Sequence, residues 1–146
     1  FRSIETILKF FAFYDRLSKY KPGLSNYLNE YMKDSRSPQE DILRKKKELF
    51  DRTVNFALSY LFARKPATKL NGATFEAILH GVAKNIDVLE KLVVKSRQAA
   101  VTRKYKELLK KEAFSTETLS EGLYQRTKVV ERLSLAESAF SNNEKS

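Results

Sequence analysis

The sequence contains no cysteine and no tryptophan, and it has one histidine and one methionine among its 146 residues. Without cysteine the chain forms no disulfide and offers no thiolate for catalysis or metal binding. Glycine and proline are scarce, at four and three copies, so few positions favour turns. The longest uncharged run, Thr53 to Ala63, spans 11 residues, whereas a membrane-spanning helix needs about 20. We therefore expect no thiol enzyme, no disulfide framework and no membrane partner.

Charged and aromatic residues are abundant instead. The chain has 28 Lys and Arg against 18 Asp and Glu, a formal net charge of +10, and 18 of the 28 bases lie in the central residues 35–114. Ten Phe and seven Tyr are enough to build one core. We predict a single helical domain over residues 1–140, followed by a polar tail over 141–146. Because the chain begins at Phe1 and its only methionine is Met32, we expect it to be part of a longer protein.

Apolar residues recur at spacings of three and four along the whole chain, which predicts an all-α fold, an irregular bundle of about five to seven helices. The segment Ser37-Pro38-Gln39-Glu40 is typical of a helix start. Thr74 and Asp87 are expected to cap later helices. The helix that begins at Asp87 is expected to extend to about Phe114, and any bend in it is expected near Ala100. The predicted helices span about residues 2–20, 24–34, 37–63, 74–86, 87–114 and 126–140. The second half of 37–63 is the expected centre of the core.

Residues for catalysis are few. His80 lies four residues after Glu76, so both would share one helix face, but a zinc site needs three or four protein ligands. We therefore interpret His80 as a surface or partly packed side chain. Neither a nucleophile paired with a histidine nor a glycine-rich phosphate loop is present. The sequence predicts no enzyme, no catalytic or metal-binding residue and no cofactor in this chain.

Basic helix faces are the stronger signal. Arg97, Lys104 and Lys111 recur every seven residues, and a neighbouring line holds Arg103, Lys106 and Lys110. Val101, Tyr105 and Leu108 lie opposite, which predicts a helix with one cationic and one buried face. Such faces can contact nucleic-acid phosphates without reading bases, although they can also be merely solvated. The candidate DNA-backbone residues are Arg44, Lys45, Lys46, Lys47, Arg97, Arg103, Lys104, Lys106, Lys110 and Lys111.

Four blocks of sequence resemble a known family. Residues 4–14 (IETILKFFAFY) and 24–32 (LSNYLNEYM) are similar to the pattern E-x-x-L-R-F-x-A-x followed by L-x-x-F-L-N-x-x-M. Residues 71–79 (NGATFEAIL) are similar to N-x-x-x-F-E-A-L-L, and residues 129–133 (VVERL) with Phe140 to V-x-x-R-I and a closing F. These patterns belong to the helical second half of the ParB/sulfiredoxin-like family found in GmrSD-type, modification-dependent restriction proteins.

The resemblance implies a non-catalytic accessory domain of a cytoplasmic restriction or phage-defence protein. Family members carry an upstream ParB-like domain with a nucleotide-binding and hydrolysing motif, and some carry an HNH-like nuclease domain downstream. Neither motif occurs in these 146 residues, so no catalytic residue carries over. The implied partners are DNA and the upstream ParB-like domain of the same protein. Arg132 is the one polar position matched, and we expect it to pair with a carboxylate. The alternative is a protein interaction module that binds no nucleic acid.

Overall fold

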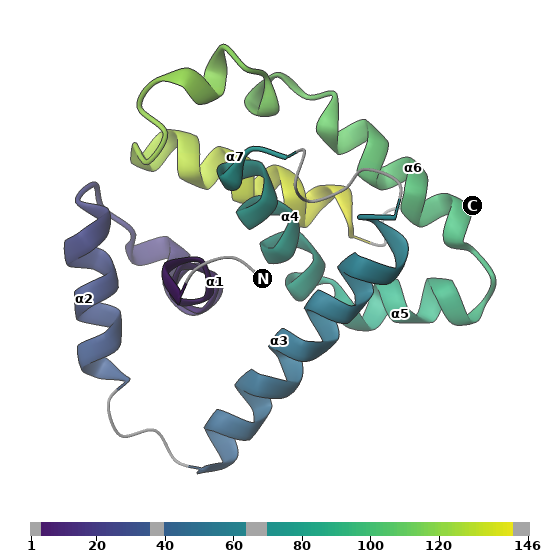
Figure 1. The fold of residues 1–146 in the computed structure, drawn as a ribbon, viewed down its shortest axis with the longest axis horizontal. Helices are drawn as coiled ribbons and strands as arrows, with labels where there is room; N and C mark the ends of the chain where they lie inside the picture. Colours follow the sequence, from purple (N-terminus) through teal and green to yellow (C-terminus); the bar gives the residue numbers. More distant parts are fainter. Residues whose placement is uncertain (1–3, 36–39, 64–69, 142–146) are drawn as a thin grey trace.

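The computed structural model describes residues 4–35, 40–63 and 70–141. Within these ranges the chain forms α-helices and short 3-10 turns and contains no strand, which confirms the all-α prediction (Figure 1). The α-helices are α1 (Ile4–Arg16), α2 (Leu24–Asp34), α3 (Glu40–Tyr60), α4 (Gly72–Lys84), α5 (Ile86–Val94), α6 (Gln98–Leu109) and α7 (Arg126–Ala139). The 3-10 turns are η1 (Leu17–Lys19), η3 (Glu112–Phe114) and η4 (Thr118–Ser120).

Helix α4 lies at the centre of the fold, where it contacts α1, α3 and α7 (Figure 1). Ten of its 13 residues are buried, because its apolar and small side chains occupy every face of the helix. The second half of α3, the expected centre, lines one side of this core instead. Phe56 and Ala57 are buried there, but Leu58 is 56% exposed.

The aromatic residues of α1 build the contact with its neighbours, as their helical spacing predicts. Phe10 meets Phe50 of α3 edge to face at 5.3 Å between ring centroids. Phe13 lies in contact with Tyr20 and Tyr27. The first helix ends at Arg16 rather than Tyr20. Tyr20 is extended and fully buried, and its hydroxyl donates to the carbonyl oxygen of Tyr124, so the chain leaves the helical path there.

Two helices begin at N-cap residues other than the predicted ones. Asn71 rather than Thr74 caps α4: its side-chain oxygen accepts from the N–H of Ala73 at 2.8 Å, and Thr74 is buried inside the helix. The residue before α5 is Asn85 rather than Asp87, and its amide donates to the carbonyls of Gly81 and Glu137. The proposed capping residues Ser37, Pro38 and Gln39 lie outside the described residues.

The prediction of a single helix over residues 87–114 is wrong, because two helices separated by a corner occupy this span. α5 ends at Val94 and α6 begins at Gln98, so the break precedes the expected bend near Ala100. Ser96 holds the corner with a φ of 60°, a left-handed conformation that few non-glycine residues adopt. The corner lets apolar residues of both helices, such as Leu89 and Val101, reach the same core. α7 follows its predicted range to within one residue.

Candidate nucleic-acid interface

The exposed face of α6 carries three cations. Arg103, Lys106 and Lys110 are all exposed, and they line a shallow surface depression of about 410 Å³ together with Ala99, Thr102 and Glu107. The opposite face buries Val101, Tyr105 and Leu108. We name Arg103, Lys106 and Lys110 the α6 patch. Its geometry matches the second predicted line of bases, because side chains three and four residues apart share one face of a helix.

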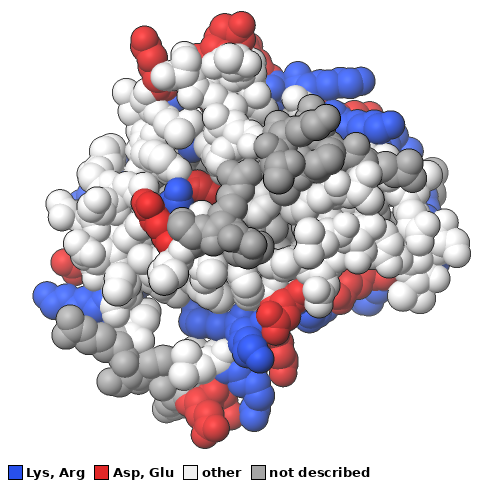
Figure 2. All heavy atoms as spheres, in the orientation of Figure 1, with Lys and Arg blue, Asp and Glu red and all other residues white. Residues whose placement is uncertain are grey.

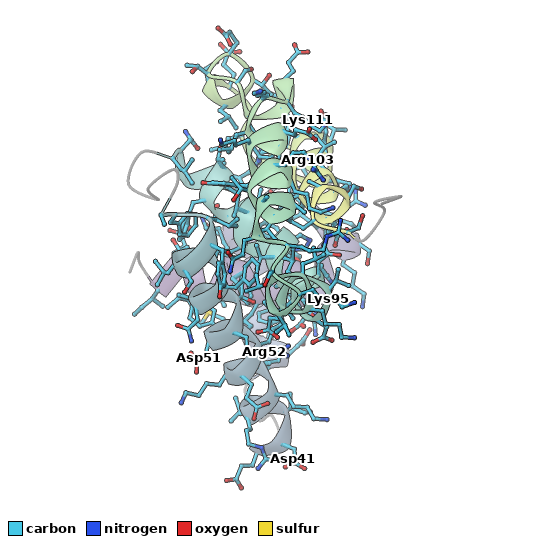
Figure 3. All side chains as sticks on the ribbon, turned by 90° about the vertical axis from the view of Figure 1, so that its right-hand side faces the viewer. Asp41, Asp51, Arg52, Lys95, Arg103 and Lys111 are labelled. Carbon is cyan, nitrogen blue, oxygen red and sulfur yellow. The ribbon has the colours of Figure 1, made fainter. Side chains whose placement is uncertain are left out.

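Further cations flank the α6 patch at both ends of the helix. Arg97 occupies the N-cap position of α6, and Lys111 follows its C-cap, Lys110; both are exposed. Figure 3 shows Lys95, Arg103 and Lys111 along the same side of the molecule. The predicted candidates on this helix begin at Arg97 and do not include Lys95. The polar run Lys95-Ser96-Arg97, placed between two apolar stretches, is the sequence signal that marks this corner.

Lys104 does not belong to the exposed cationic face. Lys104 is 8% exposed, and its ammonium donates a hydrogen bond to the carbonyl oxygen of Ser141 at 3.0 Å. On a helix, position 104 lies three residues after Val101 and four before Leu108, so it shares the buried stripe with them. The predicted line through Arg97, Lys104 and Lys111 is therefore wrong at its middle member, because Lys104 is directed under the end of α7.

The α3 cluster, Arg44 to Lys47, is divided among three environments. Arg44 pairs with Asp41 at 2.8 Å on the exposed surface. Lys46 pairs with Asp15 of α1 and donates to the hydroxyl of Tyr31 at 3.2 Å. Lys45 and Lys47 are exposed. In Figure 2, blue side chains gather beside α3 below α1, with red ones at the start of the helix.

Lys46 is engaged by α1 and α2 rather than offered to solvent. Partial burial disfavours its charged form, but the hydrogen bonds to Asp15 and Tyr31 outweigh that effect and raise the pKa of Lys46. A lysine that already holds a carboxylate is a weaker phosphate ligand, because the bound pair must first be separated. The structure thus brings the α6 bases together and uses half of the α3 cluster for its own ion pairs.

His80 lies deep in the core rather than at the surface. It is 2% exposed, and its Nε2 lies 2.9 Å from Oε1 of Glu137 on α7. Burial lowers the pKa of His80, although Glu137 acts in the opposite direction. Glu76, which was expected to share a helix face with His80, instead forms an ion pair with Lys9, with 2.7 Å between Oε2 and Nζ. Within the described residues, no three His, Asp or Glu side chains are grouped to hold a metal ion.

Arg132 is buried without the carboxylate that we expected to find beside it. The residue is 3% exposed, and its Nε and Nη1 have no hydrogen-bond partner within the described part of the chain. Its guanidinium carbon lies 5.9 Å from the ring centroid of Tyr124. The hydroxyl of Tyr124 donates to Glu76 at 2.7 Å and accepts from Lys9 at 2.9 Å. Burial lowers the pKa of Arg132.

A scan against protein-family models and searches of curated proteins and of solved structures gave no match to this chain. The resemblance to the GmrSD-type family therefore stays a prediction from the four sequence blocks. Among the described helices, none has both the length and the apolar character that crossing a bilayer requires.

Proposed function

We propose that this chain is a non-catalytic helical domain that contacts the DNA backbone through the α6 patch. The observation that carries the proposal is the division of α6 into an exposed cationic face and a buried apolar one. Cations that neutralise phosphates release condensed counterions, which favours binding without any contact to bases. Contacts of this kind fix the position of a protein on DNA and leave sequence recognition to other groups.

We further propose that the domain is the accessory half of a GmrSD-like restriction protein, next to a ParB-like domain that supplies the nucleotide or nuclease chemistry. The blocks that carry the resemblance fall in α1, in α2, across the start of α4, and in α7. All four blocks contribute buried residues to the core, for example Phe10, Leu28, Ile78 and Leu133. They are therefore scaffold positions, which suits a domain that supports chemistry located elsewhere in its protein.

The test is duplex DNA binding, measured by fluorescence anisotropy between 50 and 200 mM salt. For B-DNA, log K falls with log salt by about 0.9 for each phosphate neutralised. The triple variant Arg103→Gln, Lys106→Gln, Lys110→Gln is expected to weaken binding at 50 mM salt. It should also flatten the salt dependence by about 2 to 3 slope units.

A matched control removes the same charge from the other side of the molecule. Lys19, Lys21 and Lys33 are exposed on the segment from η1 to α2, at the opposite edge from α6 in Figure 1. Their replacement by Gln should leave the slope within about one unit of the parent. Equal losses in the two triple variants, or no binding at 50 mM salt, would contradict the proposal.

A protein interaction module is the second candidate, favoured by exposed apolar side chains at the start of α3. Ile42 and Leu43 are 45% and 52% exposed, more than their hydrophobicity favours. In this case the chain would form a stable complex with the upstream ParB-like half of its protein during size-exclusion chromatography, and would not shift duplex DNA. Replacing Leu43 by Glu should then break that complex.

A further inference from the structure

A cleft of about 550 Å³ opens between α1, α3 and the junction of α4 with α5. Its volume lies in the range of small-molecule sites, about 300 to 1,000 Å³. Phe11 and Tyr14 of α1 line one wall, Leu49 of α3 faces the cleft from another side, and Ile86 of α5 contributes a third apolar surface. None of the α6 patch lines this cleft, so it is a separate feature from the proposed DNA contact.

Ion pairs and a hydrogen bond connect the walls of the cleft at three places and set their separation. Lys46 of α3 pairs with Asp15 of α1. Arg52 of α3 pairs with Asp87 of α5 at 2.7 Å and also with Glu90. Lys84 of α4 donates to the carbonyl oxygen of Tyr14 at 3.0 Å. Because each pair of walls is joined in this way, the cleft exists before any ligand arrives, which lowers the ordering cost of binding.

Cations outnumber carboxylates along the cleft. Four Lys and Arg side chains line it against two carboxylates, Asp15 and Asp87, and both carboxylates already hold a cation. Lys84 lies 4.1 Å from the ring centroid of Tyr14 and has neutral partners, the ring and a carbonyl. Lys45 forms no ion pair with any described residue. Two positive charges at the cleft are therefore uncompensated.

We propose that this cleft binds a small organic anion with a flat apolar body, such as a ring bearing a phosphate. The anionic group would interact with Lys45 and Lys84, since charge-assisted hydrogen bonds are the strongest polar contacts available there. The flat body would lie against the apolar walls formed by Phe11, Leu49 and Ile86, since removing apolar surface from water favours binding. The proposal does not depend on DNA binding by the α6 patch.

The test titrates the full chain with adenosine monophosphate, adenosine and inorganic phosphate by calorimetry, and follows the amide shifts of Phe11, Lys84 and Ile86 by NMR. Adenosine monophosphate is expected to bind with a dissociation constant below about 1 mM, at least tenfold tighter than either of its two parts. The double variant Lys45→Gln, Lys84→Gln should weaken that binding about tenfold or more.

The matched control is Lys106→Gln, Lys110→Gln, which removes the same charge from the α6 patch and should leave the affinity unchanged. Ile42→Glu supplies an independent test, because this exposed residue lines the cleft and a negative charge there should also weaken binding. Adenosine or phosphate binding as tightly as the whole nucleotide would overturn the proposal. So would the absence of binding at 1 mM, or an equal effect of the two double variants. A failure of DNA binding with these results intact would overturn only the proposed function.

Discussion

Gly81 of α4 and Ala136 of α7 touch through their backbones. A Cβ atom placed on Gly81 would lie 2.6 Å from the carbonyl oxygen of Ala136 and 2.8 Å from its Cβ. Among the described helices, α4 and α7 make the most extensive contact. Glycine at position 81 is therefore what allows the central helix to approach α7 this closely, and the neighbouring pair His80–Glu137 depends on the same approach.

Gly81→Ala is expected to destabilise the protein by about 2 kcal/mol. Overpacking against backbone costs about 3 kcal/mol, whereas alanine in place of glycine gains about 1 kcal/mol of helix propensity. Urea unfolding followed by circular dichroism measures the difference. An unchanged or higher unfolding midpoint would show that α4 and α7 separate without penalty, contrary to the close contact described here.

The stability of the protein should fall between pH 7 and pH 5.5 because of His80. Burial lowers the pKa of His80 in the folded state, so the unfolded chain binds more protons in this window and ΔG of unfolding rises with pH. The slope for one proton is at most about 1.4 kcal/mol per pH unit. His80 is the only histidine, so His80→Gln should largely abolish the slope. A slope retained in that variant would assign the titration to another group.

Arg132→Met is expected to change the free energy of unfolding by less than about 1 kcal/mol. The variant removes a buried guanidinium whose Nε and Nη1 lack partners among the described residues, and such groups carry a desolvation cost that a well-packed apolar side chain avoids. Glu76→Gln should lose more, about 3 kcal/mol, because it leaves the largely buried Lys9 without its carboxylate and removes a negative charge that favours the charged form of Arg132. Thermal and urea unfolding of the two variants measure these losses. A larger loss of unfolding free energy in Arg132→Met than in Glu76→Gln would contradict the prediction.

Lys104→Gln should separate stability from DNA binding. Its ammonium is buried against the carbonyl oxygen of Ser141, so the variant is expected to lose about 1 to 2 kcal/mol of stability while the salt slope of DNA binding stays unchanged. Lys106→Gln should do the opposite, lowering the slope by about 0.9 with stability within about 0.5 kcal/mol of the parent. Equal salt slopes in the two variants would contradict the division of α6 into two faces.

Much of the fold was predictable because helical periodicity is a local property. The bounds of α2 and α7, and the burial of Phe10 and Phe13, followed directly from apolar spacing. The corner at Lys95–Arg97 was not predicted, because its local signal is a short polar run without glycine or proline, and a serine adopts the left-handed conformation there. Five of the six cations predicted between Arg97 and Lys111 are exposed. Lys104 was misplaced because a spacing of seven shows which residues align along a helix, but not how far the buried stripe extends around it.

The sequence by itself determined the helical class, the order of most helices and the excess of positive charge, since composition and short-range spacing carry that information. Only the tertiary structure decided which charges remain on the surface. Lys46 and Lys104 have the same side chain as Lys45 and Lys106, yet one holds Asp15 and the other lies under the end of α7. The physical reason is that burial and ion pairing depend on residues distant in the chain, such as Asp15 for Lys46 and Ser141 for Lys104, and no local pattern records that proximity.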